Sequence, residues 1–486
     1  MNELNTTTGD VSQAQVADLT PSPGTESHRA ERIRRLKRTF VSSLLMRPLA
    51  VITPFIIAPL FLRYLGQERY GLYATVISLA GFIGMSNAGI TLGLVNKLTD
   101  CHVTGDRLLA RRYVSSLTFA MLFIVVVGMV IASILVPILD WKTLLKIKGS
   151  LAAIETPWAV WITAIFTLLG IVSGVPRAVY FAYQDLEINN YWDGASKLAV
   201  LLGCVAVIYT PWGLIGIALA VIGIPAVVRG FNTLSLFFLE KRWLRPSLAL
   251  FDRSLLRDAM VQGICLFILE LAVYALFQSD NLLISLLLGP SAVTSYDLVG
   301  RLFGLAYGVF LMVLLPLWPA YGEAIRRGDL AWVRRGVRLS LIVICGGMLC
   351  FGLILYLFEA PIFRFWMHGG ATVVVSKSLI LAMTATFVLR AWVDCRSVVL
   401  NPANILWPQI WFFVTHAVLN VIAAVLLTPR MGAAGVAWAT PLTALLTSAW
   451  GYPLLMRKFF REAGKQSGAI NPPGFPVVLS EVDPAV

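Results

Sequence analysis

Long apolar runs alternate with short polar turns along most of this chain. Twelve such runs can be read from it, each close to the roughly 20 residues that a helix needs to cross a hydrocarbon layer of about 30 Å. Each run predicts a helix, because lipid cannot satisfy the hydrogen bonds of an open backbone. The expected membrane spans are 40–62, 71–96, 113–139, 157–181, 190–209, 212–239, 258–285, 292–321, 336–357, 374–399, 404–427 and 433–456.

The polar ends and the longest polar link divide the chain into parts. Residues 1–39 are rich in Thr, Ser, Asp and Glu and end in the basic run RAERIRRLKR at 29–38. No apolar core follows an early charge, which excludes a secretory signal peptide, and the composition is typical of a disordered tail. We expect a disordered cytoplasmic tail at 1–39, a six-helix lobe at 40–239, a cytoplasmic linker at 240–257, a second six-helix lobe at 258–456 and a cytoplasmic tail at 457–486.

Composition indicates that lipid, not water, surrounds most of the surface. The chain has 486 residues, of which 58% are hydrophobic and 13% charged, whereas a soluble globular protein carries about 25% charged residues. Its mean hydropathy is +0.78. We predict an all-α polytopic membrane protein of about 12 transmembrane helices, arranged in two six-helix lobes that form a V-shaped central cleft.

The net charge of +13 is informative about orientation. The side of the expected membrane that holds the N-terminus carries 24 Lys and Arg residues, and the opposite side carries eight. The positive-inside rule therefore places both termini in the cytoplasm. The basic run at 29–38 directly precedes a membrane helix, which favours contact with lipid headgroups over a nucleic-acid partner.

Residues that would carry catalysis or bind a metal are scattered. The six cysteines and four histidines form neither a CxxC pair nor an HExxH motif, and cysteines within apolar runs are typical of small core residues. No Walker loop or glycine-rich nucleotide cradle is present in the sequence. We expect no enzyme activity, no cofactor and no metal site.

The two halves of the chain repeat each other. One stretch aligns without a gap at an offset of 223 residues, and a second aligns TPWGLIGIALA at 210–220 with TPRMGAAGVAWA at 428–439. Two halves with an even number of helices have the same orientation, which favours a transporter that works by rocking of two lobes. The most specific matches are Leu65-Gly66 with Leu288-Gly289, Tyr73 with Tyr296, Gly105-Asp106 with Gly328-Asp329, and Gly213 with Gly432.

Two charged residues occupy matching repeat positions inside predicted spans. Arg47 lies in the first span and Glu270 in the seventh, where a charge costs about 2.5–3.5 kcal/mol on insertion scales. Arg47 fits two interpretations, snorkelling to the headgroups or contact with an anion in the cleft. Glu270 is a candidate for ion coupling, because a buried acid can carry a proton, or for a structural pair with Arg47 across the cleft.

Other charges make the predicted interior cationic. Arg301, Arg177 and Arg390 are candidate substrate-binding residues, because arginine binds phosphate groups well. Arg177 also fits snorkelling at its helix end, and Arg390 lies four residues before Asp394 and can be neutralised by it. Asp280 is the second candidate for ion coupling. The excess of cations favours an anionic substrate such as a phosphate or a diphosphate.

Several segments share a distinctive order of Gly, Tyr, Asp and small residues. The first is LRYLGQERYGLYATVISLAGFIGMSNAGITLGLVNKL at 62–98, which resembles the second-helix signature of polysaccharide and O-antigen flippases. These belong to the multidrug/oligosaccharidyl-lipid/polysaccharide exporter superfamily. Four further segments of this chain resemble later helices of that family, in the same order. They are VYFAYQD at 179–185, QSDNLLISLLLGPSAVTSYDLVGRL at 278–302, LNPANILW at 400–407 and TPRMGAAGVAWAT at 428–440.

The resemblance implies a function and a set of partners. It implies ion-coupled flipping of a polyprenyl-diphosphate-linked oligosaccharide across the bacterial inner membrane for surface polysaccharide synthesis, with Arg47 in the place of the family's first-helix arginine. Expected partners are that lipid-linked oligosaccharide, a proton or sodium ion, membrane lipids, a polysaccharide polymerase and glycosyltransferases. Two alternatives stay open: a multidrug or small-molecule exporter of the same superfamily, which usually has a first-helix acid that this chain lacks, and a non-transporting membrane subunit of a polysaccharide assembly complex.

Overall fold

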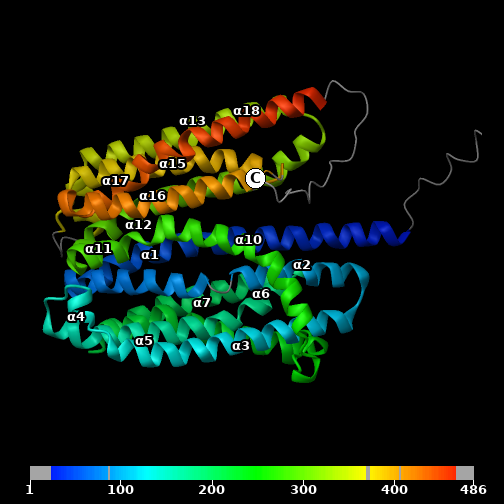
Figure 1. Cartoon of the computed structure of the whole chain (residues 1–486), viewed down its shortest axis with the longest axis horizontal. Helices are drawn as coiled ribbons and strands as arrows, with labels where there is room; N and C mark the ends of the chain where they lie inside the picture. Colours follow the sequence, from blue (N-terminus) through cyan, green and yellow to red (C-terminus); the bar gives the residue numbers. More distant parts are fainter. Residues whose placement is uncertain (1–22, 86–87, 368–372, 404, 406, 467–486) are drawn as a thin grey trace, which may run out of the picture.

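Helices joined by short turns make up the structure (Figure 1). The computed structural model describes residues 23–85, 88–367, 373–403, 405 and 407–466; at 23–51, 88–90, 92, 261–266, 269, 270, 273, 277, 315, 319 and 464–466 it describes the backbone alone. No strand occurs in these ranges, and eight of their helical stretches are long and apolar enough to cross a membrane. The predicted fold class, an all-α polytopic membrane protein, is confirmed.

The first half of the chain begins with a long kinked helix. α1 (Pro23–Met85) covers the first expected span and most of the second, and a kink at Gly66 separates the two. The second span continues in α2 (Ala88–Thr104). The elements that follow are α3 (Arg107–Ile138), α4 (Trp141–Leu144), α5 (Ser150–Val172), α6 (Gly174–Ala182), α7 (Leu186–Ile208), α8 (Gly213–Ala218), the π-helical turn η1 (Leu219–Gly223), α9 (Ile224–Ser235) and the π-helical turn η2 (Leu236–Glu240).

The second half starts after two short 3-10 turns, η3 (Arg242–Leu244) and η4 (Leu248–Leu250). Its helices are α10 (Arg253–Gln278), α11 (Asp280–Leu288), α12 (Pro290–Arg326), α13 (Leu330–Leu357), α14 (Glu359–Trp366), α15 (Lys377–Leu400), α16 (Trp407–Met431), α17 (Ala433–Leu446) and α18 (Ser448–Gln466). Over their described residues, all twelve expected spans are largely helical, and several helices extend beyond the expected ends.

Helical structure extends into both predicted tails. α1 begins at Pro23, so the basic run at 29–38 is helical, and α18 continues to Gln466. The basic run is rich in Arg, Lys, Glu and Ala, which are strong helix formers, and no Pro or Gly interrupts residues 25–47. The sequence predicted tails here because these residues are polar, although many of them also have a high helix propensity. Residues 1–22 and 467–486 lie outside the described ranges.

The internal repeat is visible in the backbone. Six described glycines have a positive φ, and they form three of the pairs that the repeat aligns. Glycine adopts this conformation at little steric cost, so both halves use it for the same three reversals. The pairs, with their φ angles, are Gly66 and Gly289 (76° and 95°), Gly105 and Gly328 (74° and 76°), and Gly213 and Gly432 (54° and 63°).

The residue after the second glycine pair is an aspartate in both halves, and it begins a helix in the same way. The Asp106 side chain accepts a hydrogen bond from the amide of Leu109 at 2.9 Å. The Asp329 side chain accepts one from the amide of Trp332 at 3.0 Å. Such an N-cap satisfies a backbone donor that has no partner within the helix. The predicted repeat therefore extends to the hydrogen bonds that start α3 and α13.

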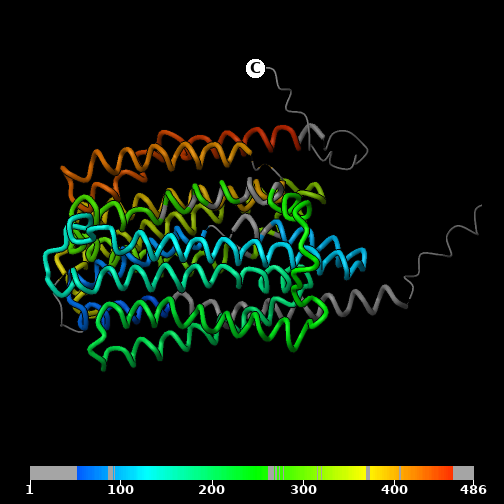
Figure 2. Tube along the Cα trace, turned by 60° about the horizontal axis from the view of Figure 1, so that its bottom comes forward, coloured from blue at the N-terminus to red at the C-terminus, as the bar shows by residue number. Residues whose placement is uncertain are grey.

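The two halves of the chain lie on either side of a central seam. In Figure 1, α3, α5, α6 and α7 occupy one side and α13 and α15–α18 the other, with α1, α2, α10 and α12 between them. Figure 2, turned by 60°, shows α16–α18 (orange to red) at one edge and α7–α9 (green) at the opposite edge. One end of the bundle carries Gly66, Gly289 and the turn around α4, and we call it the Gly66 end. The opposite end carries Gly105, Gly328 and the link 241–252, and we call it the Gly105 end.

Backbones touch at two points along this seam, where α1 packs on α12 and α2 packs on α10. A Cβ atom at Gly71 would lie 1.8 Å from the carbonyl oxygen of Pro290, and one at Gly93 would lie 2.1 Å from that of Ala259. No side chain fits at such distances. Gly71 is close to the Gly66 end and Gly93 is nearer the Gly105 end, so the two halves meet along most of the length of the bundle.

Candidate functional site

A buried ion pair on α12 contacts α1 near the Gly66 end. The Asp297 carboxylate lies 2.6 Å from Nε of Arg301, one turn further along α12. It also accepts a hydrogen bond of 2.7 Å from the hydroxyl of Tyr70 on α1. The side chains of Asp297 and Arg301 are only 12% and 15% exposed. The two charges compensate each other at a depth where either alone would be costly.

Arg301 reaches both parts of α1. Its Nη1 donates to the carbonyl oxygen of Pro54, before the Gly66 kink, at 3.3 Å. Its guanidinium lies 5.8 Å from the ring centroid of Tyr73, after the kink. At 1.5 Å per residue, Arg301 is about 16 Å along α12 from the Gly66 end. One side chain thus links the first, second and eighth spans.

A proline in the first span leaves a backbone carbonyl free to accept a hydrogen bond from the other half of the chain. Pro59 has no N–H, so the carbonyl of Phe55 lacks its usual donor within the helix. The indole of Trp366 on α14 donates to this carbonyl at 3.1 Å, and its ring stacks on Phe55 with centroids 4.6 Å apart. The break in the helix ladder is therefore used for contact between the halves.

The candidate coupling residue Asp280 adjoins the same cluster. It is 5% exposed, at the start of α11, and its Oδ2 accepts a hydrogen bond from the hydroxyl of Tyr296. Its Oδ1 has no hydrogen-bond partner among the described residues. The next residue, Asn281, donates to Ser78 Oγ at 3.3 Å and lies 3.5 Å from Oδ1 of Asp297. The structure thus brings Asp280 and Arg301 together through Asn281 and Asp297.

The turn between the first two spans is fixed by carboxylates that the sequence analysis did not identify. Arg69 forms a two-point ion pair with Glu155 on α5, at 2.6 and 2.9 Å. The same carboxylate accepts from the amide of Leu214 at 3.2 Å, and Glu68 accepts from the amide of Lys148 at 2.6 Å. A lone glutamate in the apolar run 150–172 was the available signal for Glu155.

Arg390 belongs to a separate cluster between α12 and α15. Its Nε lies 3.8 Å from Asp394, four residues along the same helix. Tyr307 on α12 donates to Asp394 at 2.5 Å, and the Arg390 guanidinium lies 5.2 Å from the Tyr307 ring centroid. The predicted neighbourhood of Arg390 and Asp394 is present, and Tyr307 is the partner that the sequence did not reveal.

The remaining candidates are less closely defined by the structure. Arg177 is exposed on the short helix α6 and forms no ion pair with a described residue. Arg47 lies in α1 and Glu270 in α10, and the side chains of both lie outside the described part of the structure. The proposed pairing of Arg47 with Glu270 therefore stays a prediction.

Most cations at the Gly105 end are engaged within the protein. Lys97 on α2 pairs with Asp258 on α10 at 2.7 Å, and Arg112 pairs with Asp252 at 2.7 Å. Hydrogen bonds from the Ser254 hydroxyl and amide, at 2.6 and 2.8 Å, lower the pKa of Asp252. These contacts attach the link 241–252 to the first half of the chain.

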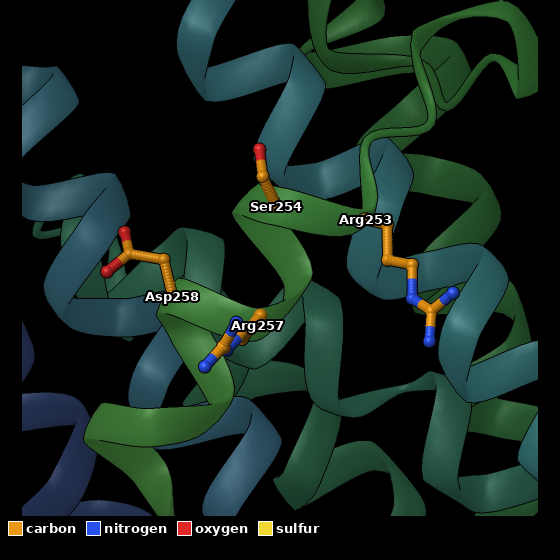
Figure 3. A pocket seen from close by; sticks show the side chains of 4 residues that line it. All are labelled: Arg253, Ser254, Arg257 and Asp258. Atoms are coloured by element: carbon orange, nitrogen blue, oxygen red, sulfur yellow. The ribbon is translucent and has the colours of Figure 1, made fainter.

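A pocket of about 780 Å³ lies at the start of α10. Its described lining consists of Arg253, Ser254, Arg257 and Asp258. In Figure 3 the Arg253 side chain projects away from Arg257 and Asp258, which lie together on the other side of the helix turn. The two arginines therefore do not converge on one point in this pocket.

Comparison with solved structures identifies the fold. The fold resembles that of an inward-facing multidrug resistance MATE family transporter of the MOP superfamily, with a TM-score of 0.72 and 15% identity over 90% of this chain and 99% of that chain. It also resembles that of the lipid II flippase MurJ in an inward closed conformation, with a TM-score of 0.65 and 13% identity over 88% and 90%. The chain has the fold of a multi-pass membrane transporter.

Comparison of sequences defines the family. The model of the polysaccharide biosynthesis protein family matches residues 36–323, and the chain belongs to that family. A putative O-antigen transporter of Salmonella typhimurium is 22% identical over 401 residues, which cover 80% of this chain and 89% of that protein. One from Salmonella typhi is 21% identical over 402 residues. The resemblance predicted from the sequence is confirmed at the level of the family.

Proposed function

We propose that the chain flips a polyprenyl-diphosphate-linked oligosaccharide from the cytoplasmic to the outer leaflet of a bacterial inner membrane. The observation that carries this proposal is the similarity to putative O-antigen transporters over 80% of the chain and 89% of the relative. Sharing a fold with a lipid II flippase supports it, because that protein too is named for flipping a lipid. The family contains transporters, which is consistent with the expectation of a non-enzyme.

The orientation and lobe boundaries follow from the same proposal. Both termini lie in the cytoplasm, because the positively charged loops gather at the Gly105 end. The Gly66 end then faces outward. The two lobes comprise 40–239 and 258–456 and rock about the seam formed by α1, α2, α10 and α12.

In this account the Asp297–Arg301 pair is a closure of the outward-facing end. In this conformation Arg301 binds Asp297 through Nε, the Pro54 carbonyl through Nη1, and the face of Tyr73. Separating α1 from α12 would break the contacts to Pro54 and Tyr70. The Arg301 guanidinium, still beside Asp297, would then be able to bind a phosphate group of the substrate with the donors released from α1. Arg301 would thus serve first in closure and then in binding.

The other candidate residues take roles along the same path. Arg47, Arg177 and Arg390 would contact the anionic headgroup at successive positions, since arginine binds phosphate oxygens with two parallel hydrogen bonds. Glu270 and Asp280 would couple the movement to a proton or sodium ion. Support for Asp280 is its burial and its carboxylate oxygen without a described partner.

Replacing Arg47 by Ala or Glu270 by Gln is expected to abolish most surface polysaccharide in a strain that lacks the wild-type gene. Each change removes one charge at a matched repeat position. The readout is surface polysaccharide, together with the amount of lipid-linked oligosaccharide that accumulates inside. Lys142→Ala, an exposed cation in the turn at the Gly66 end, is the control and should export normally. Unchanged export by both variants would contradict the mechanism.

The same strain separates the proposal from a multidrug exporter. A flippase predicts accumulation of lipid-linked oligosaccharide in the strain without the gene, and unchanged sensitivity to toxic cations. A multidrug exporter predicts the reverse pattern. The absence of an acid in the first span, 40–62, favours the flippase.

A further inference from the structure

The fifth span is polar along half of its length. α7 runs from Leu186 to Ile208, and its second part, LAVLLGCVAVI at 198–208, contains no polar side chain. Its first part, LEINNYWDGASK at 186–197, contains six polar or charged side chains. Polar side chains inside the membrane are expensive and generally face the interior of a bundle or a water-filled cavity. Half of this helix is therefore suited to water rather than to lipid.

Lys197 ends this polar part at the middle of the membrane. It is the central residue of α7, so about 16 Å of helix lies on either side of it. Its side chain is exposed. Phospholipid headgroups lie near the ends of a spanning helix, because the hydrocarbon layer is about 30 Å thick. The Lys197 ammonium is thus at a depth that headgroups do not occupy unless they are being translocated.

A second cation lies beside it on the sixth span. α7 and α9 pack directly, since a Cβ at Gly203 would lie 2.3 Å from Cδ1 of Ile224. Lys197 precedes Gly203 by six residues and Arg229 follows Ile224 by five in the antiparallel helix, so both lie about 8 Å from that contact in the same direction. Arg229 and Asp193 lie close enough to Lys197 for their charges to interact with its ammonium group.

Neither cation is neutralised within the described part of the chain. Lys197 and Arg229 form no ion pair with a described residue, although Asp193 is one turn from Lys197. Asp193 instead accepts a hydrogen bond of 3.0 Å from Asn189. Most other cations near α7 and the link are engaged, as Lys241 is with Asp185 at 2.8 Å. Asp193 is one acid beside two exposed cations, so the group keeps a net positive charge that favours a further anion.

We propose that Lys197 and Arg229 form a subsite for a diphosphate group on the face of α7 and α9, halfway across the membrane. This inference rests on the proposed function and deepens it by giving the headgroup a resting position in the first lobe. The ligand chemistry is that of two linked phosphates, whose oxygens an ammonium and a guanidinium bind together. A phospholipid headgroup shares part of this chemistry but lies at a different depth.

Labelling of Lys197 tests the subsite without any measurement of transport. The purified full-length chain, in nanodiscs of neutral phosphatidylcholine, would be treated with a sulfonated amine reagent and analysed by peptide mass spectrometry. Lys197 is expected to be labelled, and inorganic diphosphate is expected to reduce the labelling at least fivefold. Arg229→Gln should remove this protection. Lys142, exposed in the turn at the Gly66 end, is the internal control and should label equally in every sample.

Three results would overturn the inference. Lys197 could stay unlabelled while Lys142 reacts, inorganic diphosphate could fail to protect it, or anionic phosphatidylglycerol in the nanodisc could protect it as well as diphosphate does. The last result would assign the pair to bulk lipid.

Flipping assays separate this inference from the proposed function. The double variant Lys197→Gln/Arg229→Gln is expected to flip lipid-linked oligosaccharide at least tenfold more slowly than the wild type. Normal flipping by the double variant would reject the subsite and leave the function intact. Protection of Lys197 by inorganic diphosphate in a wild-type chain that flips nothing would support the subsite and reject the proposed function.

Discussion

Replacing Asp297 by Asn is expected to reduce flipping of lipid-linked oligosaccharide at least tenfold in reconstituted proteoliposomes. The change leaves the Arg301 guanidinium, 15% exposed, without its carboxylate partner at 2.6 Å. Removing one member of a buried ion pair typically costs about 3–5 kcal/mol, and 1.4 kcal/mol already corresponds to a factor of ten. The change also weakens the hydrogen bond from Tyr70 on α1, so part of the loss falls on the conformation in which α1 and α12 are joined, and the cycle between conformations is disturbed.

The chain contains a matched control on the same helix. Glu323 and Arg327 are also four residues apart on α12 with a separation of 2.6 Å, but they are 56% and 75% exposed. An exposed pair contributes about 0–1 kcal/mol, so Glu323→Gln should change flipping less than twofold. The double variant Asp297→Asn/Arg301→Gln should recover thermal stability relative to Asp297→Asn, because no unpaired charge remains. Equal behaviour of Asp297→Asn and Glu323→Gln would contradict the assigned closure.

Replacing Gly93 by Ala is expected to lower both thermal stability and flipping. The added Cβ would lie 2.1 Å from the carbonyl oxygen of Ala259, and a backbone atom cannot move aside as a flexible side chain can. Overpacking of this kind costs about 1–3 kcal/mol. The contact between α2 and α10 would have to open, and with it the adjacent ion pair of Lys97 with Asp258. A lower melting midpoint of the purified protein and at least tenfold slower flipping are the expected results.

Gly304→Ala is the matched control for this variant. Gly304 lies within α12, and a Cβ there would meet no atom within 4 Å. Both substitutions raise helix propensity by about 1 kcal/mol, so any difference between them isolates the clash. Gly304→Ala should melt no lower than the wild type. A Gly93→Ala protein that behaves in the same way would show that α2 and α10 do not approach closely in the membrane.

Much of the fold could be predicted because the membrane restricts the choices. Runs of about 20 apolar residues must be helices, so the spans follow from hydropathy alone. The repeat added the positions of the reversals, since Gly66, Gly105 and Gly213 each recur in the second half and each adopts a positive φ. The helical start at Pro23 was not predicted, because a charged segment outside the membrane is compatible both with a disordered tail and with a stable helix.

The candidate site could be predicted only in part, because several of its contacts join residues that lie far apart in the sequence. Asp297 and Arg301 are four residues apart in one helix, and that spacing alone suggests their pairing. Tyr70 is 227 residues from Asp297, and the sequence does not show that α1 packs on α12 at this point. The contact of Arg301 with the Pro54 carbonyl is equally remote. Local pattern identifies charged residues, whereas packing decides which of them meet.

Movement of a diphosphate-linked oligosaccharide across a bilayer by this chain can be measured in a purified system. The most direct measurement reconstitutes the purified wild-type chain in proteoliposomes with a fluorescent polyprenyl-diphosphate oligosaccharide, under an imposed proton or sodium gradient. The fraction of label that an added impermeant quencher can reach is followed over time. We expect transfer between leaflets to be far faster than in protein-free liposomes and at least tenfold faster than with the Asp297→Asn variant. Transfer at the protein-free rate under both gradients would contradict the proposed function.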